Sequence, residues 1–222
     1  TYDANDGTFA PLGSFATEVA IVSRCAETEV TAAGTQVLLL SEFQYTAWKL
    51  ISENQRIGIS APTSAGKSHV LVYKALDILW QTPGVGVFIV PTISLIHQVS
   101  RDIRKAASHL AMNNIGIYHA YLEGVTKRHT NTVFVLTQER ALSAFGQHDA
   151  LRDCRIVVID EVQNVERVAN EGDERARTLL EVMHEFESGR NAERIVVSGP
   201  RVENIGQLAK AIFGPSDVHC SA

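Results

Sequence analysis

Cysteine is scarce in this sequence, and the few that occur are scattered. Only 3 of the 222 residues are cysteines (Cys25, Cys154 and Cys220), and no Cys-x-x-Cys pair is present. This pattern argues against a disulfide-rich scaffold and against a cysteine-ligated zinc site, and it is typical of a reducing compartment. We therefore expect a cytoplasmic protein.

Long apolar runs are also absent. No stretch approaches the roughly 20 apolar residues that a membrane-spanning helix needs. Residues 1–15 contain neither the basic segment nor the apolar segment of a secretory signal. The sequence therefore predicts no membrane contact. Because the first residue is Thr rather than Met, we expect a piece of a longer protein or a processed form.

Positive charge is not in excess. The 20 Lys and Arg residues face 25 Asp and Glu residues, which gives a formal net charge of -5. Nucleic-acid binding draws on clustered Lys and Arg, so a surface that coats nucleic acid as a whole is excluded and any such binding must be local. No internal repeat is visible, and with 45% hydrophobic residues the chain can bury a large core as one globular domain.

From residue 56 onward, short apolar runs alternate with longer segments of helical period. This order predicts an α/β fold with a parallel sheet between layers of helices, because the runs are rich in Val and Ile, as in strands buried on both faces. The predicted strands are 57–60, 85–90, 115–118, 133–136, 156–159 and 195–197. The predicted helices are 67–80, 94–110, 138–145, 174–186 and 203–213.

The first 40 residues differ from the rest. We expect a helix over residues 15–28, followed by a stretch over 31–36, and we interpret residues 1–40 as a leader packed on a single domain formed by residues 41–222.

A phosphate-binding loop is the most specific local motif. The stretch 61–68, Ala-Pro-Thr-Ser-Ala-Gly-Lys-Ser, follows the first predicted strand of this domain and precedes a helix, which is the order of a P-loop. Backbone N–H groups in such a loop bind phosphate oxygens, the lysine reaches the terminal phosphates, and the serine hydroxyl coordinates Mg²⁺. Ala61 replaces the usual first glycine, and the alternative interpretation is a Gly-containing turn with a surface lysine. The predicted nucleotide contacts are Thr63, Ser64, Ala65, Gly66, Lys67 and Ser68.

An acidic pair, Asp160 and Glu161, follows the predicted strand 156–159. Ligands gather at this end of strands in open parallel sheets. Asp160 is placed to hold Mg²⁺ through water, and Glu161 to orient or deprotonate the attacking water. The alternative is an exposed acidic turn, which the upstream P-loop disfavours. No Asn-Lys-x-Asp guanine motif occurs, which argues against a GTPase.

The run Asp160-Glu161-Val162-Gln163 after a P-loop resembles motif II of the superfamily 2 helicases, specifically the Ski-like DExH branch. The resemblance implies a RecA-like P-loop NTPase, a three-layer sandwich with a mostly parallel sheet, with ATP and Mg²⁺ as cofactors. It further implies catalytic roles for Lys67, Glu161 and Gln163. Phe43-Gln44 resembles the Q motif, whose glutamine reads the adenine edge.

Further segments match the family in order. Residues 91–98 resemble motif Ia, residues 136–140 resemble the Thr-Pro-Glu-Lys segment, residues 171–177 resemble the stretch after motif II, and residues 198–200 resemble motif III. The single-strand contacts that the resemblance implies are Thr92, Gln98, Thr137, Glu139 and Arg140. The alternative for the two threonines is that they simply cap helices.

Two positions depart from the family pattern. Gln163 replaces the usual histidine and Pro200 replaces the motif III threonine, so the imidazole and the hydroxyl that link ATP state to strand grip in the family are missing. In the family, an arginine from a second RecA-like domain completes the ATPase site. We expect that domain downstream in the same polypeptide, and slow ATP turnover without it. The competing hypothesis is a nucleotide-gated nucleic-acid-binding or assembly module that does not unwind.

Overall fold

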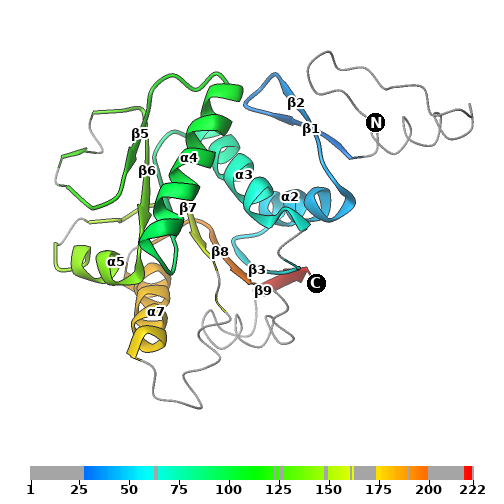
Figure 1. Cartoon of the computed structure of the whole chain (residues 1–222). Helices are drawn as coiled ribbons and strands as arrows, with labels where there is room; N and C mark the ends of the chain where they lie inside the picture. Colours follow the sequence, from blue (N-terminus) through cyan, green and yellow to red (C-terminus); the bar gives the residue numbers. More distant parts are fainter. Residues whose placement is uncertain are drawn as a thin grey trace, which may run out of the picture.

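A seven-stranded sheet lies at the centre of the molecule (Figure 1). The structure is a computed structural model that describes residues 28–62, 65–122, 124–125, 128–147, 150–160, 162, 174–189, 191–199 and 218–221. The strand order is β5-β6-β4-β7-β8-β3-β9, and every pairing in this sheet is parallel. The strands are β3 (Arg56–Ser60), β4 (Val85–Ile89), β5 (Ile115–Tyr118), β6 (Asn131–Leu136), β7 (Ile156–Ile159), β8 (Ile195–Gly199) and β9 (Val218–Ser221).

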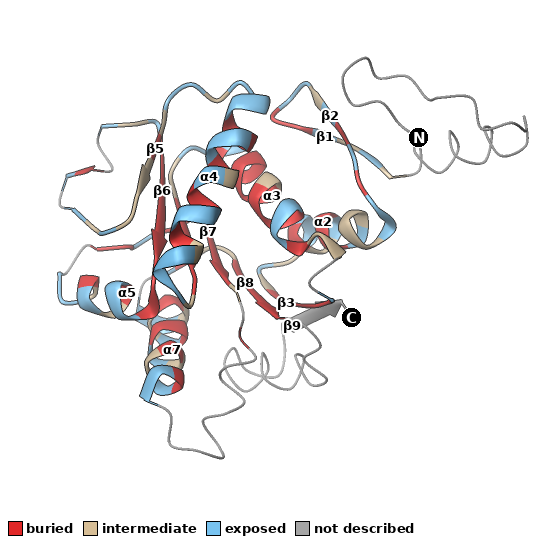
Figure 2. Cartoon of the chain, viewed as in Figure 1, coloured by how far each residue is buried: buried red, intermediate tan, exposed pale blue. Residues whose placement is uncertain are grey.

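Helices cover both faces of this sheet. On one face lie α2 (Glu42–Glu53), α3 (Lys67–Gln81) and α4 (Ile93–His109). On the other lie α5 (Gln138–Ala144), α7 (Glu174–His184) and the π-helical turn η4 (Glu185–Gly189). Alternate strand residues feed the two cores, so Val158 packs with the first group and Val157 with the second. Strands β3, β4, β6, β7 and β8 are accordingly buried almost throughout (Figure 2). This arrangement confirms the predicted RecA-like three-layer sandwich.

The six predicted strands are all present, with bounds that differ by no more than two residues at either end. Of the predicted helices, the one over 174–186 needs a correction, because α7 ends at His184 and the chain continues as η4. The π-helical turn keeps Phe186 buried, with its ring edge-on to Phe145 at a centroid distance of 5.3 Å. The predicted helix 203–213 lies outside the described residues, as does 15–28 except for Thr28 in a turn.

A β-hairpin precedes the domain core, where the sequence had indicated only a stretch of leader. Its strands β1 (Glu29–Ala32) and β2 (Gln36–Leu39) pair antiparallel. The turn passes through Ala33 (φ 46°) and Gly34 (φ 77°), and the backbone N–H of Ala33 donates to Asp77 Oδ1 of α3 at 3.0 Å. The described part of the leader therefore packs directly on α3.

Helix α2 was not predicted, although its start carries a recognisable signal. Ser41 Oγ accepts a hydrogen bond from the backbone N–H of Gln44, and the Gln44 side chain accepts one from the backbone N–H of Ser41. This reciprocal arrangement is a capping box. In the part of the chain that the structure describes, no helix combines the length and the apolar character needed to cross a bilayer.

Candidate active site

The phosphate-binding loop joins β3 to α3, as the sequence predicts. Gly66 adopts φ 75° at the N-cap of α3 and offers no side-chain cap to the first turn. The Lys67 side chain is buried and folds back into the loop, where Nζ donates hydrogen bonds to the carbonyl oxygens of Ala61 and, at 3.2 Å, of Pro62. Ala61 does not adopt a positive φ, so its position needs no glycine. Two other loop residues, Thr63 and Ser64, lie outside the described residues.

Gln44 reaches the phosphate-binding loop from α2. Its Nε2 donates to the carbonyl oxygen of Gly66 at 3.3 Å, while its Oε1 accepts from the backbone of Ser41. A Cβ at Gly66 would collide with this amide group, so the glycine supplies space as well as its left-handed conformation. The capping side chain of α2 is thus also a direct contact of the loop before α3.

Asp160 follows β7 at the same sheet edge. Because β8 alone separates β7 from β3, and the strands are parallel, Asp160 lies about 10 Å from the end of β3 by strand spacing. Its backbone N–H extends the sheet by donating to Ile89 at 3.1 Å, and the residue is partly exposed. Asp160 and the phosphate-binding loop therefore lie two strands apart at the sheet edge where ligands bind in open parallel sheets. Glu161 and Gln163 lie outside the described residues.

Thr92 and Thr137, two of the predicted contacts to single-stranded nucleic acid, act as helix caps. Thr92 Oγ1 accepts from the backbone N–H of Leu95 at 3.3 Å at the start of α4, and Thr137 Oγ1 accepts from that of Arg140 at 3.4 Å at the start of α5. The capping alternative is therefore true of both residues, and it is compatible with a ligand at the same helix ends. Gln98 is exposed further along α4.

Arg175 connects segments that are far apart in sequence. Its Nε donates to Glu139 Oε1 of α5 at 3.1 Å, and its Nη2 donates to the carbonyl oxygen of Pro91 at 2.6 Å. Its own carbonyl accepts from Gln138 Nε2 at 3.1 Å. Burial pushes the pKa of Glu139 upward, but hydrogen bonds from Thr137, its own backbone and Arg175 outweigh this and hold the pKa below its ordinary value. Arg175 falls in the stretch 171–177 that resembles the family, but its bridging role was not predicted, because its partners lie 36 and 84 residues away.

Two histidines and two arginines lie close together at the end of the edge strand β5, namely His97, Arg104, His119 and Arg140. Arg140 Nη1 donates to the carbonyl oxygen of His119 at 2.8 Å, and the His119 and His97 rings meet edge to face at 5.6 Å. Burial, followed by the charges of His97, Arg104 and Arg140, lowers the pKa of His119. The predicted contact Arg140 thus faces solvent in a patch where positive charge gathers.

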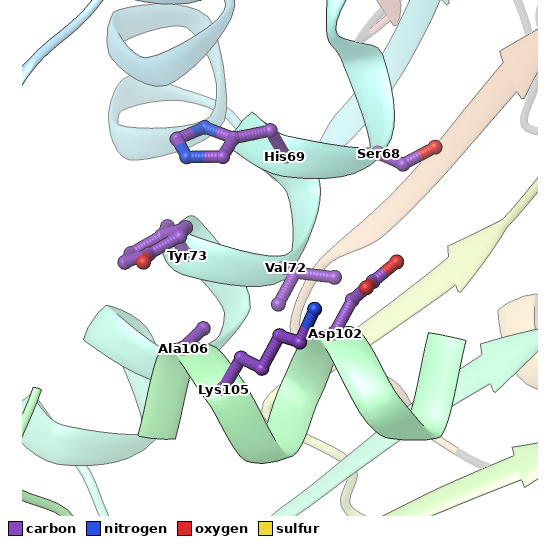
Figure 3. A pocket seen from close by; sticks show the side chains of 7 residues that line it. All are labelled: Ser68, His69, Val72, Tyr73, Asp102, Lys105 and Ala106. Atoms are coloured by element: carbon purple, nitrogen blue, oxygen red, sulfur yellow. The ribbon is translucent and has the colours of Figure 1, made fainter. Parts of the chain in front are cut away.

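A cavity of about 300 Å³ opens beside Ser68, between α3 and α4 (Figure 3). Val72 and Ala106 form apolar walls, and Asp102 and Lys105 line it from α4.

The Ser68 side chain is exposed at the first turn of α3. The hydroxyl of Ser68 and the carboxylate of Asp160 are oxygen donors of the kind that Mg²⁺ prefers, so the residues present fit the predicted metal.

A phosphate-binding loop and an aspartate that meet at one edge of a parallel sheet define a P-loop NTPase of RecA-like fold. The sequence matches the profile of the DEAD/DEAH box helicases over residues 41–199, which is more than half of the 222 residues. The chain belongs to the DEAD/DEAH box helicase family. Domains of this family are ATP-dependent helicase motors.

Among solved structures, the chain is similar to the DUF1998 helicase MrfA, with a TM-score of 0.57 and 15% sequence identity. The similarity covers 96% of this chain and 33% of that one, so the present chain spans about a third of the length of MrfA. At this identity the likeness concerns the fold. We found no significant match among curated protein sequences.

Proposed function

We propose that this chain is the first of two RecA-like motor domains of an ATP-dependent helicase or translocase that acts on single-stranded nucleic acid. The observation that supports this most directly is the placement of Lys67 and Asp160 at one edge of a parallel sheet. In this proposal residues 41–222 form the motor domain and residues 1–40 a leader packed on it.

ATP binds along the loop that precedes α3. The Lys67 ammonium exchanges the carbonyl oxygens of Ala61 and Pro62 for oxygens of the terminal phosphates. Gln44, already in contact with Gly66, reads the adenine edge. The remaining proposed contacts are Thr63, Ser64, Ala65, Gly66 and Ser68.

Ser68 and Asp160 would hold Mg²⁺ at this site. When bound, the ion neutralises negative charge on the transferring phosphoryl group. Glu161 orients the attacking water and accepts its proton. Gln163 occupies the position from which a histidine would link nucleotide to strand in relatives.

Single-stranded nucleic acid crosses the carboxyl edge of β4 and β6. These strands are neighbours, so the helices that start after them, α4 and α5, present their amino ends side by side. Helix amino ends and hydroxyl groups hold phosphates without reading bases, which suits a motor that must act on any sequence. The residues proposed to line the path of the nucleic acid are Thr92, Gln98, Thr137, Glu139 and Arg140.

We further propose membership of the Ski-like DExH branch, on the order of the motifs. The glutamine at 163 and the proline at 200 favour one competing function, a nucleotide-gated binding module that grips nucleic acid without unwinding it. A strand-displacement assay on the polypeptide that carries both motor domains separates the two, because only a helicase releases the displaced strand.

Substitution of Lys67 by alanine tests the nucleotide site. We expect Lys67→Ala to abolish binding of a fluorescent ATP analogue, because the charge that meets the terminal phosphates is lost. Lys49→Ala is the matched control, since Lys49 is an exposed lysine on α2. Circular dichroism checks that both variants are folded. Unchanged affinity in Lys67→Ala would remove the assignment of the site.

A further inference from the structure

Arg175 occupies a bridging position between the two ends of the proposed strand track. One donor of its guanidinium engages Glu139, two residues after the Thr137 cap, and another engages the carbonyl of Pro91, immediately before Thr92. Gln138 in turn donates to the backbone of Arg175. The start of α7 is thereby tied to the loop before α4 and to the first turn of α5.

This bridge has little to do with holding the domain together. The side chains of Arg175 and Glu139 are 56% and 49% exposed, and exposed ion pairs contribute only about 0–1 kcal/mol to stability. The planar guanidinium, however, can donate hydrogen bonds to two acceptors at once in fixed directions, and an ammonium group lacks this rigid geometry. Such a contact is suited to setting the relative position of two loops.

The bridge also resolves a conflict in the proposed track. A carboxylate at residue 139 would repel a phosphate backbone if it stood alone. The ion pair with Arg175 compensates that charge and keeps the carboxylate turned to a protein partner. Glu139 therefore serves the track through Arg175 rather than through a phosphate.

We propose that Arg175 is a positioning residue for single-stranded nucleic acid, which fixes the amino ends of α4 and α5 at the spacing that adjacent phosphates need. This inference rests on the proposed function. It assigns the role to the guanidinium bridge from Pro91 to Glu139 and not to direct contact with the strand.

Four single variants and one double variant of the 222-residue chain test the bridge, with fluorescence anisotropy of labelled oligouridylate and oligothymidylate as the binding readout. Arg175→Ala should weaken strand binding roughly tenfold, the scale of one lost contact. Arg175→Lys should weaken it to a similar extent, because the fork is lost although the charge remains. Arg177→Ala removes an exposed arginine two residues along α7 and should leave affinity close to wild type.

Glu139→Gln tests whether the affinity for single-stranded nucleic acid rises or falls when the carboxylate is removed. Removing a negative charge beside a polyanion should strengthen binding if only long-range electrostatics acted. The bridge predicts weaker binding, and no further loss when Arg175→Ala is added, because both substitutions break the same contact. Affinity for a fluorescent ATP analogue and the midpoint of thermal unfolding should stay at wild-type values in all variants.

Different results would contradict the proposed role of Arg175 in different ways. Wild-type affinity in Arg175→Lys, or an equal loss in Arg177→Ala, would reduce the effect to net charge and overturn the inference. A direct contact between Arg175 and a phosphate would also overturn the inference. In that case the slope of log affinity against log salt concentration would be shallower in Arg175→Ala than in the wild type, by about 0.7. Loss of cooperative unfolding in Arg175→Ala would make the residue structural. If the wild-type chain bound ATP but neither oligonucleotide, the proposed strand binding itself would fail, and the inference with it.

Discussion

The Asp77 carboxylate ties the turn of the hairpin to α3. It accepts hydrogen bonds from the backbone of Ala33 in the hairpin at 3.0 Å, from Lys74 at 2.8 Å and from Gln81 at 2.9 Å. Lys74 in turn lies over the Trp48 ring of α2, 4.4 Å from its centroid. Both charged side chains are at most 5% exposed. A buried pair that is hydrogen-bonded in this way becomes costly when one partner is removed.

We expect Asp77→Ala to lower the free energy of unfolding by about 3–5 kcal/mol, because it leaves a buried ammonium and a backbone donor without their acceptor. Urea denaturation followed by circular dichroism measures this. The double variant Lys74→Met/Asp77→Ala should recover part of the loss, since no unpaired charge then remains. The exposed ion pair of Arg175 and Glu139 serves as a comparison, because Arg175→Ala should change the free energy of unfolding by less than about 1 kcal/mol. Equal losses from the two single variants would contradict this account.

Residues with local sequence signals were predicted well, and residues defined by long-range contacts were not. Lys67 and Asp160 occur in short motifs next to strands, so the sequence was enough to place both at the same sheet edge. The contacts of Asp77 and Arg175 depend on partners 44 and 84 residues away, and the sequence next to each residue does not indicate those partners. The strand contacts of Thr92 and Thr137 remain predictions, since the structure gives them capping roles.

At the scale of elements, the hairpin shows how a tight turn is fitted to a helix end. Gly34 adopts φ 77°, and the Trp80 ring at the end of α3 packs on it so closely that an added Cβ would meet the ring. Trp80 itself is 48% exposed. The turn therefore requires glycine both for its left-handed backbone and for the space that the indole ring occupies.

Gly34→Ala and Gly124→Ala form a matched pair that separates these two requirements. Gly124 has a similar φ of 72°, but among the described residues nothing lies within 4 Å of an added Cβ. Its substitution should cost only the backbone term, roughly 1–2 kcal/mol. Gly34→Ala should cost about 1 kcal/mol more, because the ring must move. Thermal unfolding measures both, and the excess should disappear in a Trp80→Ala background. Equal costs in the native background would remove the role of the ring.

The central strands could be predicted because they are short, continuously apolar and buried on both faces. The elements that escaped prediction lack that signal. β2 alternates exposed and buried apolar residues, the hairpin turn begins at Ala33 rather than at a typical Asn-Gly pair, and β9 contains His and Ser. For α2 the capping box was present in the sequence, but Gln44 was interpreted only for its adenine contact.

The molecule as a whole presents one functional edge. The loops after β3, β4, β6 and β7 all leave the same side of the sheet, because every strand runs in the same direction. The proposed nucleotide contacts lie toward β3 and β7, and the proposed nucleic-acid contacts lie toward β4 and β6. In this proposal, nucleotide and nucleic acid are neighbours on one surface, which the proposed second motor domain would face.

We expect the 222-residue chain to bind ATP weakly and to hydrolyse it slowly, because the arginine that stabilises the transferring phosphoryl group comes from the second domain in this proposal. Phosphate release with and without single strands measures the rate. A polypeptide that includes the second domain should be faster by about 10³-fold or more. Rapid, strand-stimulated hydrolysis by the chain alone would contradict the shared site.

The hairpin has a practical consequence for choosing where a recombinant domain should start. The family match begins at residue 41, yet the backbone donor that satisfies Asp77 is Ala33, eight positions earlier. A protein trimmed to the match would lose the hairpin, which would uncover the Trp80 indole and leave Asp77 without its backbone donor from Ala33. Expression trials should therefore retain the chain from about Thr28, because the contacts of α3 extend beyond the range of the family match.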